Sequence, residues 1–487
     1  MNHLRNYLLL LVGVLLSTFS YGQKIHEKIL NNQNSNSCFG AVSIGSNVFF
    51  NFNSADFYKG YSKEAKVYRC DNNINISDSI DLSHYGGFDL FHISNIVSFS
   101  DSTFLVLGQG VIQNPYSETF SVLVMDTSLN IIKVFDSGLR SDTIVGGLSV
   151  CVVDSFLIFG GFQLQGISPK PIYLIFDEDG NFLEKKVVKH VPFGVVNGLY
   201  NFNGKIYGGF RPSQYASVFQ IDSKTFEITR LDTGSRGFAP GGFVDFDDSP
   251  NSFYFYGEYF SEYLGFAKID TNLTISIIDT FSSVNNPNTS SRGTVADIGI
   301  LAAKSEREIY FATGEGAYYI PQQLQPGLIT NMKLWRIDTG GNVIWSVLVN
   351  DSSYYFPTKT VATSDGGAVF FSMKYDWRID PQPKTSLSII KLDSTGNFVG
   401  LTEIEVPYQN LGIDVFPNPF TDGVTISGVE AREVRSATIY DVNGKVVIQE
   451  EQPESLEFDT SSFVPGTYFL QVVLKSGQSG VYKVVRE

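Results

Sequence analysis

The chain has 487 residues, among them 40 Phe, 25 Tyr and 45 Gly, and only 17% of its residues are charged. This composition favours short aromatic strands joined by glycine turns, and helical periodicity is scarce. The formal net charge is −15, and no stretch is rich in Lys or Arg. Because a polyanion would be repelled, this charge argues against nucleic acid and anionic membrane surfaces as partners.

The chain begins with MNHLRNYLLLLVGVLLSTFSYGQ, which predicts a secretory signal peptide over residues 1–22. Arg5 lies in a short polar head, an apolar core follows from about Tyr7 to Leu16, and Gly22 precedes the predicted cleavage point. A membrane anchor would need about 20 apolar residues. We therefore expect export, with no transmembrane segment in the mature chain.

Three cysteines occur, Cys38, Cys70 and Cys151, an odd number that is widely spread along the chain. A disulfide framework would be denser and even. We expect all three to be small buried apolar residues.

One unit recurs between residues 38 and 406: an alternating apolar strand, an Asp, a short polar turn and a second strand. The marking aspartates are Asp71, Asp126, Asp177, Asp222, Asp270, Asp338 and Asp393. A strand-rich repeat of about fifty residues is typical of a β-propeller. The repeat predicts an all-β fold with a seven-bladed propeller of four-stranded blades over residues 24–406.

The aspartates allow a metal interpretation, because DEDGN at 177–181 resembles part of a calcium loop. The further oxygen ligands and the bidentate glutamate of such a loop are absent from the sequence. Asp is also a preferred hairpin residue, since its side chain bonds the backbone. We favour the turn interpretation and predict no metal and no cofactor.

In such a propeller two kinds of connection lie on the same face. They are the loops between the second and third strands of each blade and the connections from one blade to the next. These loops look long and dissimilar, whereas the third-to-fourth turns are short. They carry aromatic and Arg side chains, which suit a binding surface on a rigid scaffold. The candidate binding residues are Tyr58, Tyr61, Tyr116, Arg211, Tyr215, Tyr259, Tyr263, Tyr318, Tyr319, Trp377 and Arg378. They predict recognition of a glycan or a protein, and the alternative that these side chains only pack the loops down stays open.

Evidence for catalysis is thinner, and we assign no catalytic residue. The histidines His26, His84, His92 and His190 form no HExxH pattern, and no GxSxG elbow is present. A glycosidase would need two carboxylates about 5 to 10 Å apart. Asp89 and Asp297 precede predicted inner strands, and FVDFDDSPNS contains a cluster of acids, but the sequence specifies no pair.

The repeat stops after Val406, and residues 411–487 show about six or seven alternating strands with turns at Asn443-Gly444 and Pro465-Gly466. This segment predicts a small β-sandwich. The prolines of VFPNPF end one strand ladder and fix the extended entry to the next.

The tail resembles the type A sorting domain of proteins that the type IX secretion system of Bacteroidetes exports. The landmark residues are Pro417, Asn418, Pro419, Tyr440, Asp441, Gly444, Lys445, Pro465, Gly466, Tyr468 and Lys483. The ending, VVRE, departs from the family, which usually finishes on a basic residue. The resemblance implies passage to the periplasm and then across the outer membrane, removal of the domain near residues 407–413, and release or attachment to surface lipopolysaccharide.

These observations predict a secreted or cell-surface binding protein. Its expected partners are the type IX secretion machinery and an extracellular glycan or protein. A propeller enzyme that acts on extracellular polysaccharide, and a structural component of the cell surface or biofilm, are the alternatives.

Overall fold

The chain divides into two compact units, residues 1–401 and 402–487. The computed structural model describes residues 27–31, 35–56, 61–113, 116–137, 144–165, 168–188, 194–211, 215–236, 238–244, 252–259, 263–270, 272–281, 301–314, 329–349, 351, 353–378, 384–399, 413–441, 446–475 and 479–487. The predicted signal peptide lies outside them. These residues form strands and two short 3-10 helices, η1 (Tyr85–Gly87) and η3 (Ala431–Glu433). The all-β prediction is confirmed, and none of the described helices is long and apolar enough to cross a membrane.

The first unit is built from antiparallel sheets, and in five of the sheets described the strands follow chain order; in the first sheet β2 and β3 both pair with β4. The first sheet contains β2 (Ser35–Ser37), β3 (Ala41–Ile44), β4 (Asn47–Asp56), β5 (Tyr61–Asp71) and β6 (Ile76–Asp81). The second contains β7 (Leu90–Ser98), β8 (Thr103–Gln113), β9 (Tyr116–Asp126) and β10 (Ile131–Asp136). The third contains β11 (Ile144–Val153), β12 (Phe156–Gln165), β13 (Ser168–Asp177) and β14 (Phe182–Val187).

Three more sheets of four strands repeat this order. The fourth contains β15 (Val195–Phe202), β16 (Lys205–Arg211), β17 (Tyr215–Ile221) and β18 (Ile228–Arg236). The fifth contains β19 (Phe238–Val244), β20 (Ser252–Tyr259), β21 (Tyr263–Asp270) and β22 (Ile275–Phe281). The sixth contains β23 (Leu301–Ser305), β24 (Glu308–Gly314), β25 (Met332–Ile337) and β26 (Val343–Val349).

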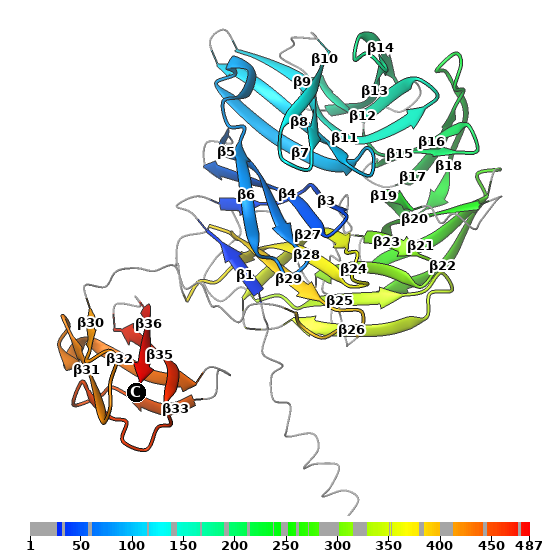
Figure 1. The fold of residues 1–487 in the computed structure, drawn as a ribbon. Helices are drawn as coiled ribbons and strands as arrows, with labels where there is room; N and C mark the ends of the chain where they lie inside the picture. The colour runs from blue at the N-terminus through cyan, green and yellow to red at the C-terminus, as the bar shows by residue number, and fades with distance from the viewer. Residues whose placement is uncertain are drawn as a thin grey trace, which may run out of the picture. The chain divides into compact units, whose positions relative to one another are not determined.

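The seventh sheet combines the two ends of the unit. Its strands are β27 (Tyr354–Ala362), β28 (Ala368–Tyr375), β29 (Ser386–Leu392) and β1 (Glu27–Leu30). Strand β1 pairs antiparallel with β29, so the start of the chain supplies the fourth strand of the last sheet, as Figure 1 shows. The first and last sheets also share one apolar cluster, which contains Phe50 from one and Phe371 from the other.

Each marking aspartate follows or ends the third strand of its sheet and holds the turn to the fourth strand. Asp177 is representative: its carboxylate accepts hydrogen bonds from the backbone N–H of Asn181 at 2.8 Å and from the side-chain Nδ2 of the same residue at 2.8 Å. These bonds hold the pKa of Asp177 below its ordinary value. Related bonds occur at Asp71, Asp126, Asp222, Asp270, Asp338 and Asp393. The turn interpretation is therefore confirmed.

Side chains of neighbouring sheets donate hydrogen bonds to the carbonyl groups of these turns. Arg69 donates to Thr127 at 3.0 Å, Lys133 to Glu178 at 2.5 Å and Arg230 to Asn272 at 3.2 Å. Gly180, in the left-handed region at φ +85°, lies so close to Phe135 that a Cβ would meet the ring at 2.2 Å. We call this end of the sheets the turn edge; its contacts fix one sheet against the next.

The opposite end, which we call the loop edge, carries the second-to-third connections and the connections between sheets. Most of the second-to-third connections are shorter than predicted. Gln113 pairs with Tyr116, and Gln165 pairs with Ser168, so two residues separate each pair of strands. The long-loop prediction is wrong there, because pairing satisfies the backbone of these polar residues and extends the strands. Longer connections remain at 315–331 and 376–385.

A buried ionic cluster fixes strand β1 to the last sheet. The Lys374 side chain, only 9% exposed, contacts the carboxylates of Glu27 and of Asp351, the latter at 2.6 Å. Tyr355 donates its hydroxyl hydrogen to Asp351 at 3.0 Å, and Ser388 donates to Glu27 at 2.6 Å. Burial disfavours the ammonium ion, but the two carboxylates raise the pKa of Lys374 above its ordinary value. The cluster therefore balances two negative charges on one cation.

Replacing Lys374 by Met should destabilise the protein strongly, because two carboxylates would stay buried without a cation. We expect a loss of about 3–5 kcal/mol in the free energy of unfolding, measured by urea denaturation. Glu27→Gln, the matched variant, retains the contact between Lys374 and Asp351 and should cost less. Equal losses in the two variants would contradict the shared-cation arrangement.

The pH dependence of unfolding provides a second measurement on the same cluster. Burial opposes ionisation of Asp351, but Lys374 lowers the pKa of this carboxyl below its ordinary value. Its contribution to stability is therefore fully present above the unfolded pKa, near 4, and is lost as the pH falls through the lower folded pKa. Asp351→Asn should weaken this acid-dependent loss.

The second unit consists of two sheets that share one core. The smaller contains β30 (Asp414–Phe416), β31 (Gly423–Ser427) and β34 (Glu457–Asp459). The larger has the order β33 (Val446–Glu451), β32 (Val434–Asp441), β35 (Gly466–Leu474) and β36 (Ser479–Arg486). Val424 and Ile426 of the smaller sheet pack with Ile439 and Leu470 of the larger. The unit is a small sandwich of the predicted kind.

Candidate functional site

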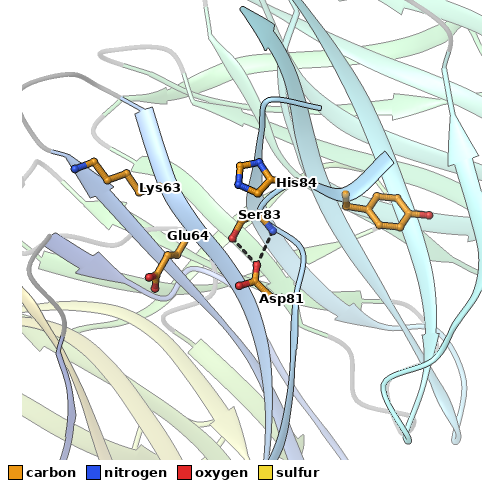
Figure 2. Close-up of a pocket in the computed structure, with 6 residues that line it drawn as sticks. Lys63, Glu64, Asp81, Ser83 and His84 are labelled. Atoms are coloured by element: carbon orange, nitrogen blue, oxygen red, sulfur yellow. Dashed lines mark hydrogen bonds between the residues drawn. The ribbon is translucent and has the colours of Figure 1, made fainter. Parts of the chain in front are cut away.

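A pocket of about 390 Å³ lies at the loop edge of the first sheet. The beginning of β5 supplies two of its residues, and the end of β6 with the segment after it supplies the others (Figure 2). The lining residues are Lys63, Glu64, Asp81, Ser83, His84 and Tyr85. The pocket therefore lies on the side of the sheet where the sequence predicted binding.

Ser83 is buried, and its hydroxyl group both accepts and donates a hydrogen bond. It accepts a hydrogen bond from the backbone N–H of Ala65 at 3.0 Å and donates to Asp81 Oδ1 at 2.5 Å. Asp81 Oδ1 also accepts from the Ser83 backbone N–H at 2.9 Å (Figure 2). Because the hydroxyl hydrogen points to a carboxylate, Ser83 is not arranged as the nucleophile of a Ser-His-Asp triad.

The two residues of the pocket that carry rings, His84 and Tyr85, contact residues outside the pocket. Nδ1 of the exposed His84 lies 2.9 Å from the carbonyl oxygen of Asp89. Since a carbonyl oxygen only accepts, Nδ1 carries the hydrogen, and Nε2 of the neutral ring is an acceptor. The half-buried ring of Tyr85 meets Phe91 edge to face at 6.0 Å. His84 therefore keeps its orientation through Asp89, and the Tyr85 ring packs against the apolar cluster that contains Phe91.

The carboxylates of the pocket share one neighbouring cation. Lys66 Nζ lies 3.5 Å from Glu64 and 3.9 Å from Asp81. Burial raises the pKa of Asp81, but the hydrogen bonds from Ser83 and the charge of Lys66 outweigh it, so the pKa lies below its ordinary value. A glycosidase acid needs the opposite shift. The pocket suits the binding of hydroxyl groups better than proton transfer by Asp81.

The backbone places six of the candidate binding residues at the loop edge, on four different sheets. Each of the six is the first residue of a third strand or the last residue of a second strand: Tyr61, Tyr116, Arg211, Tyr215, Tyr259 and Tyr263. Tyr259 and Tyr263 pair directly across their hairpin. Three others, Tyr58, Tyr318 and Tyr319, lie outside the described residues.

Trp377 and Arg378, after β28, have contacts that favour the packing interpretation. Trp377 packs against a buried cluster that includes Tyr354 and Phe356. Arg378 donates to Asp376 at 2.7 Å and to the Asp351 carbonyl oxygen at 2.8 Å. Arg378 therefore helps to hold the connection between the sixth and seventh sheets, whereas Trp377 packs on the seventh sheet itself.

The remaining candidates from the sequence are only partly described. His84 lines the pocket. His92 is half-buried in β7, and burial lowers its pKa to about 4. His26, His190, Asp297 and the acids at 245–248 lie outside the described residues. All three cysteines are free and buried, as predicted. Glu64, Asp81 and Tyr85 were missed; the polar run DLSHY between two strands was the only signal for Asp81 and Tyr85, and Glu64 lies in the separate polar run YSKE.

In the second unit, the side chain of Asn418 in the PNP landmark bonds the backbone of β36 as a residue of a neighbouring strand would. Its Nδ2 donates to the carbonyl oxygen of Lys483 at 2.8 Å, and its Oδ1 accepts from the backbone N–H of Val485 at 2.9 Å. The N–H of Phe420 then donates to the Val485 carbonyl oxygen at 2.8 Å. The landmark segment thereby covers the free edge of β36.

Two further residues fix the turn that precedes β35. The Tyr468 hydroxyl donates to the Val464 carbonyl oxygen at 2.8 Å and accepts from its N–H at 3.2 Å. Arg486 donates to the carbonyl groups of Thr460, at 2.8 Å, and of Phe463. The penultimate basic residue therefore has a structural role in this chain.

The other landmark residues occupy different surroundings. Tyr440 donates to Gln471 at 3.0 Å, and Asp441 is half-buried. Gly444 and Lys445 lie outside the described residues. The exposed landmark residues are Pro417, Pro419, Pro465, Gly466 and Lys483.

Replacing Asn418 by Asp should destabilise the second unit, because a carboxylate would face the carbonyl oxygen of Lys483. We expect a loss of about 1–3 kcal/mol, measured as a lower melting temperature of the C-terminal transition. Lys483→Ala is the control, since it retains the carbonyl acceptor and removes only an exposed side chain. Identical melting of the Asn418→Asp variant and the unaltered chain would contradict the strand-like role.

Residues 414–487 match the family model described as secretion system C-terminal sorting domain. The chain therefore carries such a sorting domain, which implies handling by a type IX secretion system and export to the cell surface or the extracellular space. A Bacteroidetes origin is implied by the same domain. No curated protein was found to be similar in sequence.

Solved structures similar to the chain include several β-propellers. The propeller domain of the Trilobed protease from Pyrococcus furiosus is 12% identical, with a TM-score of 0.43, over 78% of this chain and 99% of that chain. The Cps50 (Swd1) propeller domain of Myceliophteria thermophila is 11% identical, with a TM-score of 0.44, over 75% and 99%. Pyrococcus horikoshii acylaminoacyl peptidase is 11% identical, with a TM-score of 0.40, over 82% and 59%. At these values the similarity carries no argument about activity.

Proposed function

We propose that this chain is a secreted or cell-surface binding protein that recognises a glycan. Residues 1–22 act as a signal peptide, residues 24–406 form a closed seven-bladed propeller, and residues 411–487 direct export by the type IX secretion system. The sorting domain at 414–487 is the observation that carries the proposal. A protein with such a domain works outside the cell, where polysaccharides are abundant ligands.

Closure of the propeller is supported by the contacts of the chain's first strand. Strand β1 completes the last sheet and is held there by Glu27, and the first and last sheets pack against each other. Stacked sheets bury the apolar faces that a single sheet leaves exposed, and closure of the ring removes long free edges. The result is a rigid scaffold on which the loop edge presents side chains.

Glycan binding is supported by the chemistry of the pocket. The ionised Asp81 and the Nε2 atom of His84 accept hydrogen bonds from hydroxyl groups, and Tyr85, whose half-buried ring packs against Phe91, also lines the pocket. Pockets that combine a ring with a few convergent polar groups are common ligand sites. A sugar has both the hydroxyl groups and the apolar face that this arrangement matches.

Deleting residues 411–487 should trap the protein in the periplasm of a bacterium that has a type IX secretion system. The expected result is loss of the protein from the cell surface and the medium, measured by fractionation and by protease accessibility on intact cells. Undiminished surface display of the deleted chain would contradict the export function.

The purified chain without residues 1–22 should be retained on at least one polysaccharide of a panel of soluble and insoluble polymers, without release of reducing ends. Replacing both His84 and Tyr85 by Ala should weaken retention about tenfold or more, because two contacts of the pocket are lost. Glu178→Ala, an exposed change at the turn edge, is the matched control. Release of new ends would instead support the polysaccharide-acting enzyme.

A further inference from the structure

The larger sheet of the second unit carries an apolar row on its outward side. The register places four residues opposite one another on adjacent strands, and we call them the outward row: Val446, Tyr440, Phe469 and Lys483. Side chains alternate along a strand, and the adjacent residues Ile439 and Leu470 belong to the core of the sandwich. The outward row therefore faces away from that core.

The exposure of the outward row agrees with this geometry. Val446 is 44% exposed, Lys483 is exposed, and Tyr440 and Phe469 are half-buried. In the part of the unit that the structure describes, the core cluster includes none of the four. An antiparallel sheet that faces water normally presents polar residues on that side. A continuous row of three apolar side chains is thus a feature of an interaction surface.

The smaller sheet of the same unit provides a contrast. Its outward side carries Asp414, Thr425, Glu457 and Asp459, with Phe416 as a single apolar residue. This side is acidic and has the polar character of a solvated surface. The two faces of the sandwich differ both in polarity and in charge.

The landmark residues of the sorting domain separate into two groups in this structure. Asn418 and Tyr468 make hydrogen bonds within the unit and hold its fold. Tyr440 and Lys483 instead lie on the outward row, although the Tyr440 hydroxyl also bonds Gln471 beside it. Asn418 and Tyr468 therefore stabilise the fold of the unit, and Tyr440 and Lys483 remain available to a partner.

We propose that the secretion machinery recognises this domain through the outward row. The partner contacts the row with an apolar patch and places an acidic group opposite Lys483. The inference rests on the proposed export function, which supplies the partner. The cationic end of an otherwise apolar row selects an acidic partner, because a desolvated ammonium needs a counter-charge. The acidic face of the smaller sheet would repel the same partner.

The test measures export of full-length variants in a bacterium that has a type IX secretion system. Phe469→Ser and Lys483→Glu should each lower the ratio of surface-exposed to periplasmic protein by about tenfold, as expected for central contacts of an interface. Lys483→Arg retains the charge and should restore export. Melting of the purified variants establishes that the second unit stays folded.

Two matched changes on the opposite sheet provide the controls. Phe416→Ser removes a side chain that is 50% exposed, and Glu457→Lys reverses a charge. Both should leave export unchanged. A loss of export equal to that of the outward-row variants would show that the domain tolerates no surface change and would overturn the assignment of one face.

Failure of this inference is distinguishable from failure of the export function. Normal export of Phe469→Ser and Lys483→Glu, with retention of the 411–487 deletion in the periplasm, overturns the docking surface and leaves the export function intact. Export of the deletion overturns both. A dimer of the unaltered chain that Phe469→Ser converts to a monomer with normal export would assign the face to a second copy.

Discussion

The aspartate that closes the third-to-fourth turn is the interaction on which the first unit depends. At Asp177 one carboxylate accepts the N–H and the side-chain Nδ2 of Asn181, and these bonds add to the backbone bonds of the tight turn. Neighbouring sheets then donate to the carbonyl groups of the same turns, as Arg69 does to Thr127. A local turn thereby becomes the element that fixes the spacing of the sheets.

This constraint gives the two edges of the sheets different roles. At the turn edge, side chains such as Arg69, Lys133 and Arg230 join one sheet to the next. At the loop edge the connections vary in length, and the polar pocket between β5 and η1 lies there. A rigid scaffold with one variable edge is a common way to support recognition, because the scaffold limits the entropy lost on binding.

The sequence predicted those features that follow from local chemistry. The aspartates indicated their turns because Asp bonds its own backbone, and the order of strands followed from alternation. The pairing of β1 with β29 was not predictable, since no periodic signal connects residues so distant in the chain. Most of the second-to-third connections were predicted too long, because polar residues such as Gln165 extend the strands. The role of Asn418 depends on β36 as its partner, which spacing alone does not reveal.

Hydrogen exchange tests most directly the proposed closure of the ring by β1. Amide exchange of the chain without residues 1–22 is followed by mass spectrometry over Glu27–Leu30 and Ser386–Leu392. Closure predicts that both segments exchange slowly and open together, because the ladder and the Glu27 cluster join them. Rapid exchange of Glu27–Leu30 beside a protected Ser386–Leu392 would contradict closure and leave the last sheet with three strands.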